Sequence, residues 1–305
     1  MPSSTFFTAP PDWHWLVILY FFFGGIAGGS YLIAALIDLF GRVADRPLAR
    51  LGYIVAFVAA IFCPILLTAD LTRAERFWHM LLQSKRLLPM FKYWSPISFG
   101  SWILLIFSLF AFVSFVGALA EGGRPRGPRW PRLLWLRRGP VGTVIAVIGG
   151  LFALAFAGYT GVLLDVTNRP IWADNQLLGL LFLASGATTA AALLALLSHW
   201  QATAAPDAEF RLARMETGTS LVELVVLVLL VLTLGQVAKV WLSAWGLLLV
   251  VGVVLAGILL PLALHWRPRL LGGLSAASAS VLASVLALVG GFILRVVVIL
   301  SAQAV

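Results

Sequence analysis

Long apolar runs separated by short polar stretches recur along the whole chain. Each run is long enough to cross the hydrocarbon core of a membrane as a helix, which takes about 20 residues. The pattern therefore predicts an all-α, polytopic membrane protein with eight transmembrane helices. We expect these helices at Leu16–Phe40, Leu51–Thr68, Ile97–Leu119, Val141–Leu164, Leu177–Leu197, Leu221–Ala238, Leu242–Leu264 and Val281–Leu300.

The polar stretches between the runs are too short to form domains of their own. The long polar intervals are residues 69–96 and 120–140. We therefore expect residues 1–305 to form a single membrane domain in which the helices group as two four-helix bundles. Composition agrees with this prediction, because 61% of the residues are hydrophobic and only 11% are charged, and a soluble domain could not cover so much apolar surface.

The distribution of lysine and arginine predicts the orientation of the chain. With both termini on the outer side, the inner loops hold thirteen basic residues and the outer loops seven, and inner loops normally carry the excess. The net charge of +9 is thus explained by topology, and we expect no nucleic-acid partner. The loop after the second run is an exception, since it places five basic residues outside: Arg73, Arg76, Lys85, Arg86 and Lys92.

The first run is unusually rich in glycine, at positions 24, 25, 28 and 29. Glycines spaced by four residues allow close approach of a neighbouring helix, and the same lack of bulk could admit a flat ring. Periodicity leaves both interpretations open. The sequence has one cysteine, Cys63, and four histidines, two of them at inner ends of runs. This inventory cannot ligate an iron–sulfur cluster and favours neither haem nor another metal site.

Unusual polar groups are predicted to gather near the outer face. Tyr20 lies roughly 6 Å and Tyr159 roughly 7 Å below that boundary at 1.5 Å per residue. Arg295 comes out at a similar depth in the eighth run. Such groups inside a bilayer usually mark a ligand or proton path, although an interfacial belt of aromatic residues is the simpler alternative. The remaining members of the group are Asp70, His14, His79, Asn168 and Arg169.

Four stretches together resemble the NrfD/PsrC family, the integral membrane subunits of polysulfide-reductase-type complexes. They are "WHWLVILYFFFGGIAGGSYLIAAL", "ADLTRAERFWHML", "WSPISFGSW" and "GYTGVLLDVTNRPIWADNQLLGLLFLASG". The resemblance implies a multi-pass subunit of a prokaryotic inner (cytoplasmic) membrane, surrounded by membrane lipids. It implies that the protein binds a quinone (menaquinone or ubiquinone) near the outer face and has no haem or iron–sulfur centre. It further implies electron exchange with a peripheral, ferredoxin-like iron–sulfur subunit at that face, and through it with a molybdopterin enzyme or a multihaem cytochrome.

The resemblance also assigns residues. Tyr159 matches the family's quinone-site tyrosine, while Tyr20 stands where the polysulfide reductase subunit has a histidine. We expect both phenols to contact the quinone headgroup, and Asp70 and His79 to carry protons. Further candidates for the quinone site are His14, Gly25, Gly28, Asn168, Arg169 and Arg295. For Asp70 the alternative is a helix N-cap, and for His79 an ordinary interfacial histidine.

Several expectations concern the rest of the chain. Leu71–Leu82 reads as a short amphipathic helix that docks an iron–sulfur partner or lies on lipid headgroups. Glu223, predicted near the inner end of the sixth run, is a candidate for an inner proton path. Asp38 is expected to pair with Arg42, four residues on. We expect the protein not to be a complete enzyme alone, and the rival class is a secondary transporter or ion-translocating protein.

Overall fold

The computed structural model describes residues 13–123, 130–173, 175–201, 206–267 and 275–303. Eight helices in these residues are long and apolar enough to cross a membrane, which confirms the prediction of a polytopic helical protein. Seven are built on single α-helices, namely α1 (Trp15–Phe40), α2 (Arg46–Asp70), α3 (Pro96–Glu121), α4 (Gly139–Asp165), α5 (Leu177–Gln201), α6 (Pro206–Thr233) and α9 (Ala276–Ser301).

The seventh span is composite. It begins as α7 (Ala244–Leu248), widens into the π-helical segment η5 (Leu249–Leu259) and ends as α8 (Leu260–Trp266). The widened segment packs closely on α9, where a Cβ atom on Gly257 would lie 2.5 Å from the Cα of Gly290. Glycine at both positions therefore allows the two backbones to touch.

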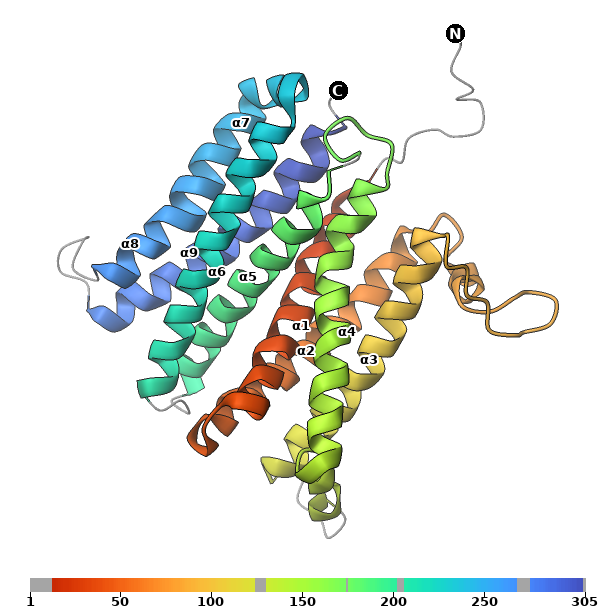
Figure 1. The fold of residues 1–305 in the computed structure, drawn as a ribbon, viewed down its shortest axis with the longest axis vertical. Coiled ribbons are helices and arrows are strands. Elements are labelled where there is room, and N and C mark those ends of the chain that lie inside the picture. The colour runs from red at the N-terminus through yellow and green to blue at the C-terminus, as the bar shows by residue number, and fades with distance from the viewer. Residues whose placement is uncertain (1–12, 124–129, 174, 202–205, 268–274, 304–305) are drawn as a thin grey trace.

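The helices form two groups, which lie side by side in Figure 1. In the first bundle α1 packs on α2 and α4, and α3 packs on both of those. In the second bundle α5 packs on α6 and α9, and η5 and α8 pack on α9. Contacts of α5 with α1 and α4 join the bundles, so α1 and α5 occupy the middle of the molecule.

The glycines of α1 are used for close packing. A Cβ atom on Gly28 would lie 2.8 Å from the carbonyl oxygen of Ala153 in α4, and one on Gly29 would lie 2.6 Å from that of Gly186 in α5. At Gly25 the space is shared by Gly186 and by the guanidinium of Arg295, whose Nη2 would lie 2.6 Å from a Cβ atom. Of the two interpretations open from the sequence, the structure therefore supports close helix approach.

Two helix boundaries differ from the prediction in ways that matter for function. Helix α6 begins at Pro206 rather than Leu221, because its first turns are polar and a hydropathy pattern detects only the apolar part. It ends at Thr233 rather than Ala238, since Gly235 adopts a φ of +53° and starts the 3₁₀ helix η4 (Gly235–Leu242). Glu223 consequently lies in the middle of a span and not near its inner end.

The loop after α2 contains less helix than predicted. Instead of an amphipathic helix over Leu71–Leu82, it forms the 3₁₀ helix η2 (Ala74–Met80). The rest of the loop folds back on the start of α3, where the Trp102 Nε1–H donates to the carbonyl of Met90 at 3.0 Å. In Figure 1 this loop stands out from the side of the first bundle.

The two described ends of the chain lie together at one face of the molecule. The Gln303 side-chain amide donates to the carbonyl of Trp13 at 2.6 Å. Trp13 stacks on Trp172 with ring centroids 5.1 Å apart, and the Trp172 Nε1–H donates to the carbonyl of Val298. An even number of spans requires both ends on one side, and under the predicted orientation this is the outer face.

Ion pairs at the opposite, predicted inner face also correct the sequence analysis. Asp38 pairs with Arg137 at 2.7 Å and not with Arg42. Arg137 lies at the end of the arginine-rich segment before α4. The bond therefore joins α1 to a segment far away in the sequence, which a local i, i+4 rule cannot predict. An ion pair between the buried Asp45 and the partly exposed Arg211 ties the start of α2 to α6 and hence links the two bundles.

Candidate functional site

Tyr20 and Tyr159 come together inside the first bundle. Tyr20 projects from α1 and is 2% exposed, and Tyr159 projects from α4 and is 7% exposed. The two phenols are close enough to interact electrostatically, and Cys63 of α2 lies in the same environment of Tyr20. Phe156 borders the Tyr20 ring at a centroid distance of 6.3 Å. Both residues lie within the outer half of their helices.

The Tyr159 ring is fixed by α3. Its hydroxyl donates to the carbonyl of Pro96, the first residue of α3, at 2.7 Å, a bond that this oxygen can accept because a carbonyl has two lone pairs. The ring lies directly over Gly100, where a Cβ atom would collide with it. While its proton is held by Pro96, the Tyr159 oxygen can still accept a hydrogen bond from a second group.

Tyr20 has different neighbours from Tyr159. Its side chain is almost fully buried, and the groups that act on it electrostatically are Cys63 and Tyr159. The two described cavities are lined by other residues.

His14 and Asp70 lie at neighbouring ends of α1 and α2. Both are exposed, His14 just before α1 and Asp70 at the last position of α2, and their charges lie within electrostatic reach of each other. The N-cap of η2 is Arg73, so the structure does not support a capping role for Asp70. A carboxylate at a helix C-terminus is opposed by the helix dipole, whereas the interaction with His14 favours it.

The other predicted site residues lie further away. His79 sits in η2 with its ring against Trp78, at a centroid distance of 3.8 Å. Asn168 is exposed in the loop after α4, and Arg169 lies in the turn that leads to Trp172. The structure thus brings Tyr20 and Tyr159 into one environment and His14 and Asp70 into another. The other three residues, His79, Asn168 and Arg169, lie in loops.

Arg295 lies on the other side of α1, in the second bundle. It is fully buried, and its guanidinium donates to the carbonyl of Phe21, to Ser185 Oγ and to the carbonyl of Gly291. The carboxylate of Glu223 is near enough to interact with it and lies beside Ser185 and Thr188. Tyr20 faces α2 and α4, so the α1 backbone separates Arg295 from the two phenols.

Some residues around these sites carry little signal in the sequence. Gly100 and Pro96 have no reactive group of their own, and their role depends on the ring that lies over them. Glu216 and His265 pair at 3.3 Å in the inner half of the second bundle. The sequence signal for this pair is a carboxylate in a helix. The predicted start of the sixth span at Leu221 places that carboxylate outside the membrane. In the described part of the protein, no group of three or more His, Cys, Asp or Glu side chains could hold a metal ion.

Comparison with known proteins agrees with this architecture. The protein is 25% identical over 200 residues to protein NrfD of Escherichia coli, an alignment that covers 63% of its length and 61% of that relative. It is 27% identical over 185 residues to a polysulfide reductase component of Wolinella succinogenes, covering 57% of its own length and 54% of the relative. It is 24% identical over 103 residues to a selenate reductase component of Mesobacillus selenatarsenatis, covering 34% and 22%.

These alignments span less than two thirds of each relative's length. The model of the family "Polysulphide reductase, NrfD" matches residues 4–305, which is nearly the whole sequence. The chain therefore belongs to the NrfD family of membrane subunits of reductase complexes.

Proposed function

We propose that this protein binds a membrane quinone between α1, α2 and α4 near the outer face. The observation that carries the proposal is the pair of phenols, because the Tyr20 side chain is almost fully buried and lies within electrostatic reach of Tyr159. A quinone has two oxygen atoms that need such partners, and its ring suits the apolar walls that Phe156 and its neighbours provide. The quinone, when bound, supplies two-electron, two-proton redox chemistry, and the protein supplies position and proton acceptors.

Each residue of the site then has a distinct task. Tyr20 donates a hydrogen bond to one headgroup oxygen, and the oxygen of Tyr159 accepts one from the other when the quinone is reduced. Asp70, with His14 beside it, takes up the released protons at the outer rim, because a carboxylate exchanges protons readily with water. His79 in the adjoining loop is the second candidate for this transfer.

The loop between α2 and α3 is the proposed docking site of a peripheral, ferredoxin-like iron–sulfur subunit. Its five basic residues are all exposed, and it exposes Phe91, Tyr93 and Trp94 as well. Aromatic side chains and arginine are enriched at protein interfaces. A molybdopterin enzyme or a multihaem cytochrome would exchange electrons with the quinone through this subunit, in the inner membrane of a prokaryote. Copurification with an iron–sulfur protein would support this role, whereas solute uptake into liposomes by this protein alone would favour a transporter.

Tyr20→Phe tests the quinone site directly. We expect it to slow quinol-dependent turnover of the intact complex about tenfold to a hundredfold, because one preorganised hydrogen-bond donor is lost. Turnover is measured with a soluble quinol analogue in the purified complex. Tyr31→Phe, which removes a buried α1 hydroxyl that bonds to Ser114, is the matched control and should leave turnover unchanged. Wild-type turnover in Tyr20→Phe would remove the basis of the proposal.

Asp70→Asn tests the proton acceptor. We expect it to slow quinol oxidation severalfold and to change its pH dependence. The wild type should slow at low pH, where Asp70 is protonated and cannot accept a proton, and the variant should have lost this acidic limb. Glu75→Gln, an exposed acid of η2, is the control. A pH–rate profile of Asp70→Asn that overlays the wild type would exclude Asp70 from proton transfer.

We also propose an inner proton path through Glu223. Glu216, Ser220 and Glu223 stand four and three residues apart on α6 and so share one face. Apart from the ion pair between Glu216 and His265, both oxygens of Glu216, Ser220 Oγ and His265 Nε2 are buried without a hydrogen-bond partner among the described residues. Buried polar atoms of this kind are normally satisfied by internal water, which also conducts protons. This row of polar groups runs from the inner half of α6 to Glu223 and Arg295, next to α1.

A further inference from the structure

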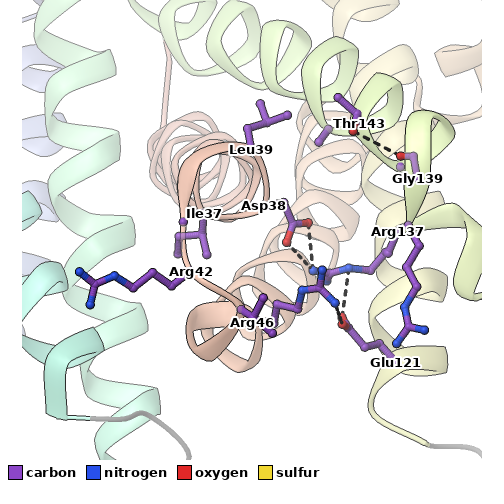
Figure 2. A pocket seen from close by; sticks show the side chains of 14 residues that line it. Ile37, Asp38, Leu39, Arg42, Arg46, Glu121, Arg137, Gly139 and Thr143 are labelled. Carbon is purple, nitrogen blue, oxygen red and sulfur yellow. Dashed lines mark hydrogen bonds and ion pairs between the residues drawn. The ribbon is translucent and has the colours of Figure 1, made fainter.

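A cavity at the predicted inner end of the first bundle, opposite the two phenols, forms a second candidate site. Its volume is about 350 Å³, and it is bounded by the ends of α1 and α3 and the starts of α2 and α4. This volume is within the range of small-ligand sites, which is about 300–1,000 Å³. Figure 2 shows its lining, in which most of the polar side chains are charged.

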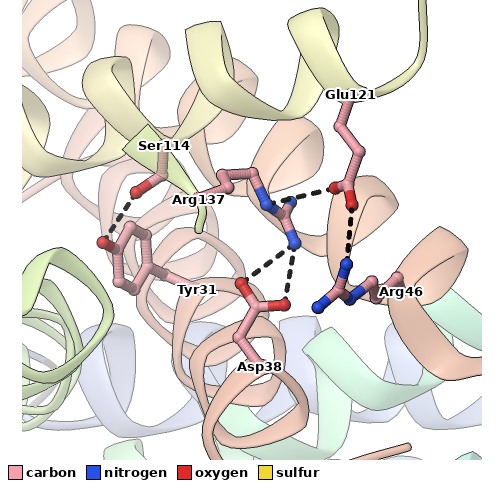
Figure 3. A network of polar contacts seen from close by, with 6 residues as sticks. All are labelled: Tyr31, Asp38, Arg46, Ser114, Glu121 and Arg137. Atoms are coloured by element: carbon pink, nitrogen blue, oxygen red, sulfur yellow. Dashed lines mark hydrogen bonds and ion pairs between the residues drawn. The ribbon is translucent and has the colours of Figure 1, made fainter. Parts of the chain in front are cut away.

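The lining carries a surplus of positive charge. Arg42, Arg46, Arg137 and Arg138 line the cavity together with the two carboxylates of Asp38 and Glu121. Figure 3 shows the central network, in which Arg137 bonds to both oxygens of Asp38 and its Nε lies 3.2 Å from Glu121. Arg46 lies 3.9 Å from Glu121. Once the two carboxylates are paired, two arginine charges remain for an anion.

One nitrogen at the centre of this network lacks a partner. The Arg137 side chain is only 4% exposed, and its Nη1 is buried without a hydrogen-bond partner among the described residues. A guanidinium nitrogen in such a place carries donors that only water or an acceptor ligand can satisfy. Phosphate oxygens are strong acceptors for guanidinium groups.

The start of α4 adds backbone donors to the same cavity. Gly139 and Gly142, both in its first turn, line the cavity, and this helix end has no side-chain cap. Gly139 has a φ of +66°, a conformation that other residues rarely adopt. An uncapped helix N-terminus has free N–H groups and a partial positive charge, both of which favour an anion.

The flanks of the cavity are apolar. Leu36 and Phe40 on α1 are 39% and 81% exposed, and Val141 and Val144 on α4 are 42% and 52% exposed. These are the same two helix ends that line the cavity. A soluble anion needs no such surface, whereas acyl chains do.

From these observations we infer that the cavity binds the phosphate headgroup of an anionic phospholipid, with the acyl chains against α1 and α4. Basic pockets between helices on the cytoplasmic side of membranes suit such lipids, because charge and the attached acyl chains act together. The inference concerns the opposite end of the bundle from the proposed quinone site and does not depend on it. The bound lipid would bridge α1, α2 and α4 through charges that the protein alone leaves unsatisfied.

The experiment measures lipid binding to the full-length protein in its purified complex by native mass spectrometry, in a zwitterionic detergent. The probes are phosphatidylglycerol, phosphatidylcholine and inorganic phosphate. The test variant is the double substitution Arg42→Gln with Arg138→Gln, which leaves the network of Figure 3 intact. The control removes two other exposed charges at the same face, with Arg132→Gln and Arg267→Gln.

We expect phosphatidylglycerol to bind at least fivefold more weakly to the test variant and less than twofold more weakly to the control. Phosphatidylcholine should bind weakly to all three proteins. Equal weakening in the control would show diffuse attraction to the whole basic face and overturn the inference. Displacement of the lipid by millimolar inorganic phosphate would also overturn it, since the site would then take a soluble anion. The inference would also be overturned if the test variant keeps its lipid but loses a subunit of the complex.

Discussion

Replacing Gly100 with alanine is expected to slow quinol-dependent turnover about tenfold to a hundredfold, the loss that follows when a reacting group is misplaced by about 1 Å. The added methyl group would occupy the space of the Tyr159 ring, so the ring must leave its place over α3. Its hydroxyl then loses the bond to the Pro96 carbonyl.

The comparison that makes this result specific uses another glycine. Gly158, the residue before Tyr159, has as its nearest neighbour the carbonyl oxygen of Gly179, 4.0 Å from a Cβ atom. Gly158→Ala makes the same chemical change in a space that accepts it, and turnover should stay near the wild-type value. If Gly100→Ala also retained full turnover in a folded complex, the position of the Tyr159 ring would not matter to catalysis. Tyr159→Phe provides the second measurement, because it removes the hydroxyl without moving the ring.

Replacing Arg295 with methionine is expected to lower the free energy of unfolding by about 3–5 kcal/mol, the usual effect of leaving a buried charge uncompensated. Methionine roughly fills the volume, but it leaves the Phe21 and Gly291 carbonyls without their donor and the Glu223 carboxylate without the positive charge near it. Unfolding is measured in detergent by chemical denaturation, and Arg267→Met at an exposed helix end is the control.

A second substitution separates charge from packing. In Arg295→Met with Glu223→Gln the buried carboxylate is gone, so part of the lost stability should return, because a neutral amide costs less to bury than an unpaired charge. If the loss of unfolding free energy in the double variant equals the sum of the losses in Arg295→Met and Glu223→Gln, the two residues are not coupled.

The single Glu223→Gln variant also examines the inner proton path. Reconstituted in liposomes, it should retain quinol oxidation but lose any proton uptake from the inner side. Unchanged uptake would mean that protons do not pass through Glu223.

Hydropathy alone was sufficient to predict the number of spans, because a membrane requires about 20 apolar residues per helix and this requirement is local in the sequence. The same local patterns placed Tyr20 and Tyr159 at similar depth, since rise per residue converts sequence position into height. The family, too, followed from stretches of contiguous residues, and the match to residues 4–305 confirmed it.

Rotation and neighbours were decided only by the tertiary structure. Depth does not say which face of a helix meets which partner, so it groups Arg295 with the phenols although α1 stands between them. Asp38 has an arginine four residues away, yet it pairs with Arg137, which is 99 residues distant. Gly100 gives no signal because its contribution is the absence of a side chain under a ring. The sequence therefore determined how far each polar group lies below the surface, while packing decided which groups share a site, because contacts between helices depend on the shapes of both partners.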